Sequence, residues 1–240
     1  MLRRTLPIPV IALVLLTGAC GSDTDGKGTE TGATATADAS ATADATAEGA
    51  TCRELLGDAG VKWLESGTGG AGTVHMKSRH DLEQARSMLS GQIENWEPGR
   101  KGIPTYAESD VCGVTADSDP GSELALEYRP SILPFDAPIT GSTDSDLTET
   151  PVNSDVRLLR RVADGDDVEY IVFVTCKLPG TPAQQENAVP IEGRMTDTLT
   201  GDDSERDRFT YLLHSARVMT GELGCQNKPV VPAEPPASVK

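Results

Sequence analysis

The chain has 240 residues, a formal net charge of −16 and an aromatic content of only 4%. This acidic balance argues against nucleic acid as a partner, because affinity for nucleic acid comes from neutralising phosphates with Lys and Arg. It also argues against direct attachment to anionic lipid surfaces. The low aromatic content argues against a carbohydrate-stacking cleft, and the length suits one domain with a real core.

The first 19 residues have the parts of a signal peptide. Arg3 and Arg4 supply positive charge, and the run 8–16 is apolar. That run is too short to cross a membrane, which takes about 20 apolar residues. We therefore expect residues 1–19 to be a lipoprotein signal peptide that is removed on export.

Cys20 is the expected lipidation site. The stretch LTGAC at 16–20 resembles the bacterial lipobox, with Thr17 where that motif most often has Leu. In that motif the cysteine thiol takes up a diacylglyceryl group, and two acyl chains anchor a protein stably to a membrane. The chain has five cysteines, and setting Cys20 aside leaves an even number that can pair. The alternative is an ordinary secretory signal cleaved near Ala19, with no lipid.

Residues 20–50 form a low-complexity segment of Gly, Ser, Thr, Ala and Asp, in which ATADA at 35–39 recurs at 41–45. Such a segment has no large apolar side chain and buries too little surface to offset the entropy of ordering. We expect a disordered tether that holds the domain about 30 Å from the lipid surface. The domain itself is expected to span 51–228.

The remaining cysteines are Cys52, Cys112, Cys176 and Cys225. An exported domain lives where disulfides persist, so two bridges are expected. No C-x-x-C pair is present, which argues against a zinc ribbon or thioredoxin chemistry, and no metal site is predicted. Three pairings are open, and proximity in the sequence favours Cys52–Cys112 and Cys176–Cys225.

Two helices are expected in the first half of the domain. The first begins with a capping box of Thr51 and Glu54 and is weakened by Gly57. Its inward positions are Cys52, Leu55, Leu56 and Ala59. The second begins near Asp81 and is stopped by Pro and Gly at 98–99. Its apolar stripe is Leu82, Ala85, Leu89, Ile93 and Trp96.

The strands are predicted from alternation and turn residues. Residues 122–128 alternate as a half-buried strand, and two arms, 156–162 and 168–178, flank an Asp-Gly turn at 164–165. A short strand is also expected within 187–194. Between them, 129–153 reads as a long irregular loop and a candidate binding loop. Its acidic residues Asp144, Asp146 and Glu149 lack EF-hand spacing, so calcium is not predicted.

The final helix has one apolar stripe and a natural C-cap in Gly224, directly before Cys225. Residues 229–240 are Pro-rich and are expected to form an extended, frayed tail. The stripe is Phe209, Leu212, Leu213, Ala216, Met219 and Leu223. Together these elements predict an α+β fold with two disulfides. We expect an antiparallel sheet of about three to five strands, with a central hairpin, packed against two or three helices.

The overall build resembles the small secreted lipoproteins of actinobacterial type. The matching features are the lipobox at Cys20, the Ala/Thr/Asp tether, paired leucines after Cys52, and a last helix that ends in Glu-Leu-Gly-Cys at 222–225. Only the lipobox is specific. The resemblance therefore implies a location at the outer face of the cell membrane and no particular activity.

No catalytic motif is present: there is no G-x-S-x-G, H-E-x-x-H, S-x-x-K or nucleotide-binding glycine pattern. No catalytic residue and no cofactor is predicted. The favoured function is a binding or protein-interaction module at the cell envelope that holds a partner protein or a small solute. The alternative is a cell-wall hydrolase or modifying enzyme, which would need a concave site around His75, His80 or His214.

Overall fold

The computed structural model describes residues 49–69, 73–99, 102–139, 147–162 and 167–240. The predicted signal peptide, Cys20 and the tether as far as residue 48 lie outside the described residues, as does the turn at 164–165. Within the described ranges, no helix is both long enough and apolar enough to cross a membrane.

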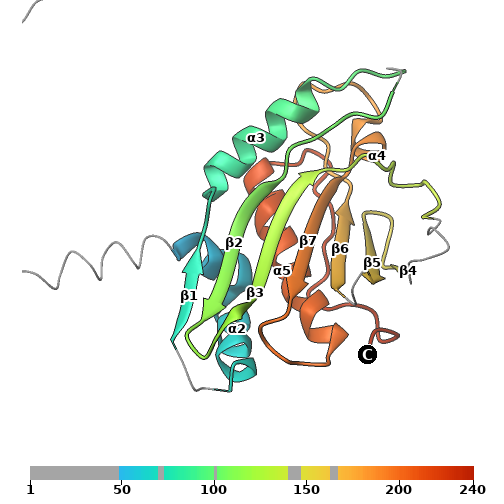
Figure 1. Cartoon of the computed structure of the whole chain (residues 1–240). Coiled ribbons are helices and arrows are strands. Elements are labelled where there is room, and N and C mark those ends of the chain that lie inside the picture. The colour runs from blue at the N-terminus through green and yellow to red at the C-terminus, as the bar shows by residue number, and fades with distance from the viewer. Residues whose placement is uncertain (1–48, 70–72, 100–101, 140–146, 163–166) are drawn as a thin grey trace, which may run out of the picture. The chain divides into compact units, whose positions relative to one another are not determined.

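A sheet with seven antiparallel strands organises the domain, in the spatial order β1-β2-β3-β7-β6-β5-β4 (Figure 1). Every neighbouring pair runs antiparallel. The strands are β1 (Val74–Lys77), β2 (Ser109–Ala116), β3 (Asp119–Pro130), β4 (Leu147–Pro151), β5 (Val156–Val162), β6 (Val168–Val174) and β7 (Ile191–Asp197). The α+β class and the hairpin of β5 and β6 are confirmed.

The expected sheet of three to five strands is too small. β1 has only four residues, β2 carries a register shift between Asp110 and Cys112, and β4 lies inside the predicted loop 129–153. Short edge strands and bulged strands lack the clean alternation that identifies a strand in a sequence. The strand expected within 187–194 is β7, which lies at the centre of the sheet.

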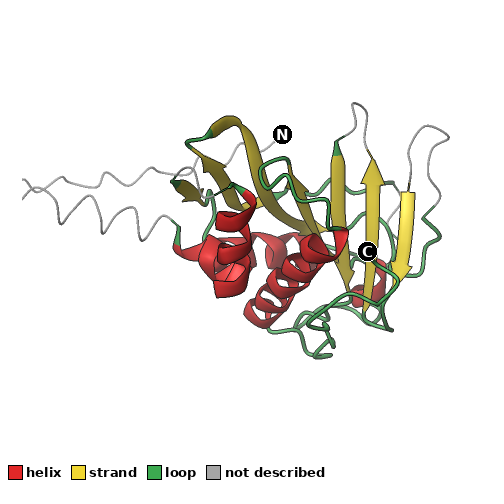
Figure 2. Cartoon of the chain, turned by 90° about the horizontal axis from the view of Figure 1, so that it is seen from below, coloured by secondary structure: helices red, strands yellow, loops and turns green. Residues whose placement is uncertain are grey.

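Three helices cover one face of the sheet: α2 (Ala50–Gly67), α3 (Leu82–Glu94) and α5 (Glu205–Leu223) (Figure 2). A single-turn helix, α4 (Gln185–Ala188), precedes β7. The two later long helices are confirmed, but α3 ends at Glu94, so Trp96 of the predicted stripe lies beyond the helix. Asp81 caps α3 in a capping box with Gln84, and Gly224 ends α5 in the left-handed conformation with φ 63°.

Helix α2 departs from the sequence prediction at its start. It begins at Ala50 after Gly49, with no side-chain cap, and Thr51 is buried inside the helix instead of capping it. Gly57 breaks the helix at φ 66°, so the residues after it no longer follow the helical spacing set by Cys52 and Leu55. Ala59 is therefore exposed, whereas it was expected to face inward.

Both expected disulfides are present. Cys52–Cys112 joins α2 to β2, and Cys176–Cys225 joins the segment after β6 to the residue that follows the C-cap of α5. The bridges therefore fasten the first and the last long helix to the sheet.

The expected frayed tail at 229–240 is wrong. Val231 and Val239 are buried and belong to the main hydrophobic core. The Arg206 amide of α5 donates to the Lys240 carbonyl at 2.8 Å, and the Arg206 guanidinium pairs with Glu234. Proline restricts the chain to extended conformations before folding, so a Pro-rich segment loses little entropy when it docks.

The core between helices and sheet contains a buried hydroxyl pair. The Tyr128 hydroxyl on β3 lies 2.6 Å from Ser215 Oγ on α5, and both side chains are buried. Beside it, Gly193 of β7 leaves the space that the Tyr128 ring occupies: a Cβ at this glycine would lie 2.5 Å from Tyr128 Cε1. The centre of the sheet is thus packed around one tyrosine.

Candidate ligand site

A pocket of about 460 Å³ lies where α3 ends and the chain turns toward β2. Such a volume falls within the range of roughly 300–1,000 Å³ that is usual for small-molecule sites. Helix α3 stops at Glu94 with Asn95 as its C-cap, and Gly99 at φ 76° allows the reversal that follows. The lining residues are Gln92, Asn95, Trp96, Glu97, Gly99, Gly102, Ile103, Pro104, Thr105 and Tyr106.

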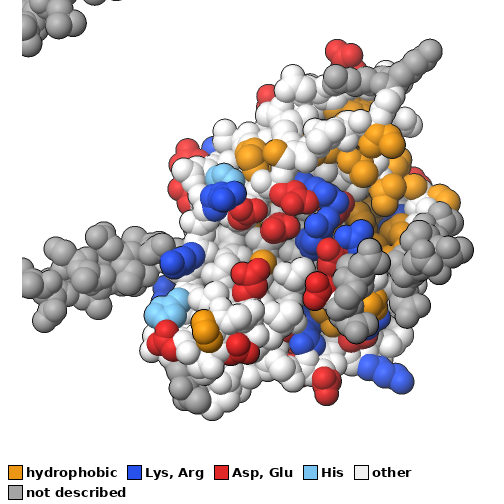
Figure 3. Space-filling model, in the orientation of Figure 1, with side chains coloured by type: hydrophobic (Ala, Val, Ile, Leu, Met, Phe, Trp, Pro, Cys, Tyr) orange, Lys and Arg blue, Asp and Glu red, His pale blue; other side chains and the backbone are white. Residues whose placement is uncertain are grey.

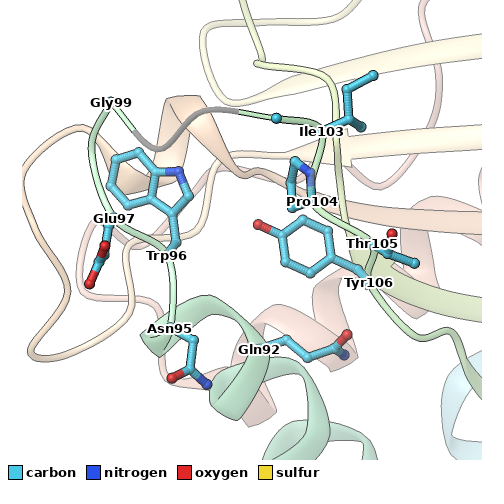
Figure 4. A pocket seen from close by; sticks show the side chains of 10 residues that line it. Gln92, Asn95, Trp96, Glu97, Gly99, Ile103, Pro104, Thr105 and Tyr106 are labelled. Carbon is cyan, nitrogen blue, oxygen red and sulfur yellow. The ribbon is translucent and has the colours of Figure 1, made fainter.

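Aromatic and polar groups alternate around this Trp96 pocket (Figure 4). The Trp96 indole forms one wall, Tyr106 and Pro104 form the opposite wall, and Asn95 and Gln92 lie at the base. Both Trp96 and Tyr106 are partly buried and pack against the main core, which fixes the two aromatic walls in place. The pocket therefore has firm apolar sides and a polar floor.

Gln92 holds the two sides of the pocket together. Its Oε1 accepts from the Ala107 amide at 2.5 Å, and its Nε2 donates to the Ala107 carbonyl at 3.2 Å. This paired contact fastens the segment before β2 to α3. Asn95 Nδ2 donates to the Gly91 carbonyl at 2.6 Å, which leaves Asn95 Oδ1 as an acceptor for a ligand.

The sheet face without helices carries a second conspicuous group of side chains, a charged cluster on β3, β7 and the approach to β2 (Figure 3). Arg129 lies 2.7 Å from both Glu108 and Glu192, and Arg194 contacts Glu192 at 3.3 Å. Burial raises the pKa of Glu127, and the Glu108 carboxylate adds to this increase while Arg194 opposes it. The hollow between these residues has no room for a water molecule, and the buried Nε of Arg194 has no hydrogen-bond partner among the described residues.

The same open face has an apolar corner. Phe135, Leu159, Ile171 and Phe173 form a small second core, closed over by the segment that follows β3. Arg157 holds that segment, because its guanidinium donates to the Ala137 carbonyl at 3.2 Å and lies over the Phe135 ring. Part of the predicted binding loop 129–153 is thus a packed strap.

The three histidines lie on different elements and contact different partners. His75 pairs with Asp117 at 2.7 Å on the surface, and His214 packs over Gly57. His80 Nδ1 lies 3.2 Å from Ser109 Oγ, but Ser109 is 0% exposed and cannot reach a substrate. None of the histidines lines the Trp96 pocket.

Metal ligands do not gather in the part of the chain that the structure describes: it contains no group of three or more His, Cys, Asp or Glu able to hold an ion. Asp144 and Asp146 lie outside the described residues. Glu149 is on β4 and pairs with Arg157 at 2.8 Å.

The pocket residues were not identified from the sequence. The spacing of Trp96 after Ile93 predicts a core position on α3, and the low aromatic content does not favour an aromatic site. A usable signal was present in the chain, since two aromatic residues at 96 and 106 bracket a Pro- and Gly-rich stretch directly after a helix. Comparison with protein-family models, with curated proteins and with solved structures finds no match to this chain.

Proposed function

We propose that this protein is a lipid-anchored binding module at the outer face of the cell membrane, and that the Trp96 pocket is its ligand site. The observation that carries the binding function is the pocket itself, with fixed aromatic walls and polar groups at its base. The disulfides agree with an oxidising, extracytoplasmic location. Lipidation at Cys20 rests on the resemblance of its surroundings to a lipobox.

The binding function is tested by retention of envelope material on the immobilised full mature protein. Trp96→Ala should abolish retention of a small solute or envelope fragment that the unaltered protein holds. The matched control is Trp63→Phe, which alters the chain's other tryptophan. Trp63 stacks on Tyr211 with ring centroids 4.8 Å apart and donates to Asp202, away from the pocket. Equal retention by both variants and the unaltered protein would disprove the assignment of the site.

The anchor is tested separately, by mass spectrometry of the protein isolated from membranes. We expect the mature chain to begin at Cys20 with a diacylglyceryl group on its sulfur. A Cys20→Ala variant should lose fatty-acid labelling and membrane association. Membrane retention of an unlabelled variant would show that another segment anchors the protein.

A further inference from the structure

We propose that the Trp96 pocket binds a saccharide, with a pyranose ring seated against the indole. This inference rests on the proposed binding function and specifies the ligand class of the same site. It follows from the arrangement of flat apolar walls and hydrogen-bonding groups around one hollow of about 460 Å³.

The walls suit a ring with a flat C–H face. Figure 4 shows the Trp96 indole on one side of the pocket, with Tyr106 and Pro104 on the other. Aromatic faces bury large apolar areas with little loss of conformational freedom. Because Trp96 and Tyr106 already pack against the core, a ring that enters between them does not have to order either wall.

The polar groups favour hydroxyls over the other ligands that aromatic pockets take. The lining offers the indole N–H of Trp96 as a donor, Asn95 Oδ1 and the Glu97 carboxylate as acceptors, and the Thr105 hydroxyl as both. A sugar hydroxyl donates and accepts, so a sugar can satisfy all of these groups. A proline-rich peptide brings mainly carbonyl acceptors. A quaternary ammonium group would be attracted to Glu97 but forms no hydrogen bonds, so it would leave the Trp96 N–H, Asn95 and Thr105 unpaired.

The rim gives the pocket a direction in which a longer ligand can extend. Ile103 is 82% exposed beside Pro104, an unusual placement for a large aliphatic side chain. An acyl substituent on a sugar, such as an N-acetyl group, presents a methyl that can cover this side chain. We therefore expect an N-acetylated oligosaccharide to bind more tightly than one without acyl groups.

The experiment follows Trp96 fluorescence in the full mature protein that carries Trp63→Phe, so that Trp96 is the one emitting tryptophan. The probes are an N-acetylglucosamine tetramer, maltotetraose, choline and an octaproline peptide. We expect a blue shift of emission that saturates with the N-acetylated tetramer and at least a tenfold weaker response to the other three. The reciprocal Trp96→Phe protein, in which Trp63 emits, should give no shift.

Two further variants keep the test decisive if changes at Trp96 disturb folding. Thr105→Val and Asn95→Asp change exposed side chains, and each should weaken tetramer binding about tenfold. Thr105→Val should leave thermal unfolding unchanged, and any loss of stability in Asn95→Asp is attributed to the lost contact with the Gly91 carbonyl. If choline or octaproline saturates the signal and neither saccharide does, the saccharide assignment is wrong while the pocket remains a binding site. If no probe shifts the emission and envelope material is retained through Trp96, the ligand class is likewise overturned. If Trp96-dependent retention is absent as well, the proposed function itself fails.

Discussion

The hydroxyl pair between Tyr128 and Ser215 allows a sharp test of how the sheet and the last helix are joined. Ser215 Oγ donates to the Leu212 carbonyl at 2.8 Å, so the Tyr128 hydroxyl must be the donor in the 2.6 Å contact with Ser215. Ser215→Ala therefore strands a buried donor, which costs about 1–3 kcal/mol. Tyr128→Phe removes the donor and leaves Ser215 bonded to Leu212, at a cost of about 0.5–1.5 kcal/mol.

The double variant shows whether Tyr128 and Ser215 form one hydrogen bond or contribute to stability independently. With Tyr128→Phe added to Ser215→Ala, no donor is stranded, so we expect stability equal to or above that of Ser215→Ala alone. Urea unfolding with the disulfides intact measures the differences in the free energy of unfolding. In thermal unfolding, each 1 kcal/mol corresponds to about 2–4 °C in the melting temperature. A double variant that loses the sum of the two single losses would refute the assignment of donor and acceptor. Ligand binding should be unaffected in all three proteins, since neither residue lines the Trp96 pocket.

Two further predictions concern the sheet and its bridges. Gly193→Ala should lower the free energy of unfolding by about 1–3 kcal/mol through overpacking against Tyr128. The matched control is Gly113→Ala, in which the new Cβ would meet no side chain within 4 Å. This variant should be up to about 1 kcal/mol more stable than the unaltered protein. Replacing Cys176 and Cys225 by Ser should reduce stability by about 4 kcal/mol, as judged from urea midpoints. Unchanged midpoints would show that the tail and β6 hold the end of α5 without the bridge.

The sequence predicted well the elements whose signals are local. The start of α3 near Asp81 and the end of α5 at Gly224 depend on hydrogen bonds and backbone angles within a few residues, so both could be predicted from the sequence. The arms of the β5–β6 hairpin were found for the same reason, because a turn dipeptide separates two apolar runs. The pairing of the four cysteines was also correct, although it rested only on proximity in the sequence.

The features that were missed depend on neighbours far away in the chain. β1 is a strand because β2 pairs with it, and its four residues carry no pattern of their own. Thr51 has the sequence of a cap, but the bridge at Cys52 and the buried leucines draw it into the helix. The tail at 229–240 packs because Val231 and Val239 join a core that is built mostly from residues far away in the chain, which no local rule can predict.

The Trp96 pocket also depends on contacts that are not local in the sequence, and these contacts keep its exposed aromatic walls in place. Its walls come from the end of α3 and from the segment before β2, and the paired contact between Gln92 and Ala107 fixes their separation. Five residues beyond Ala107, Cys112 is bridged to Cys52, so β2, which follows this wall, is fastened to α2. A mouth built from turns would ordinarily be the least stable part of a domain. Here the packing of Trp96 and Tyr106 against the core and the paired contact of Gln92 with Ala107 hold the two aromatic walls in place before any ligand arrives. Walls that are already ordered lose little entropy when a ligand binds, which favours affinity.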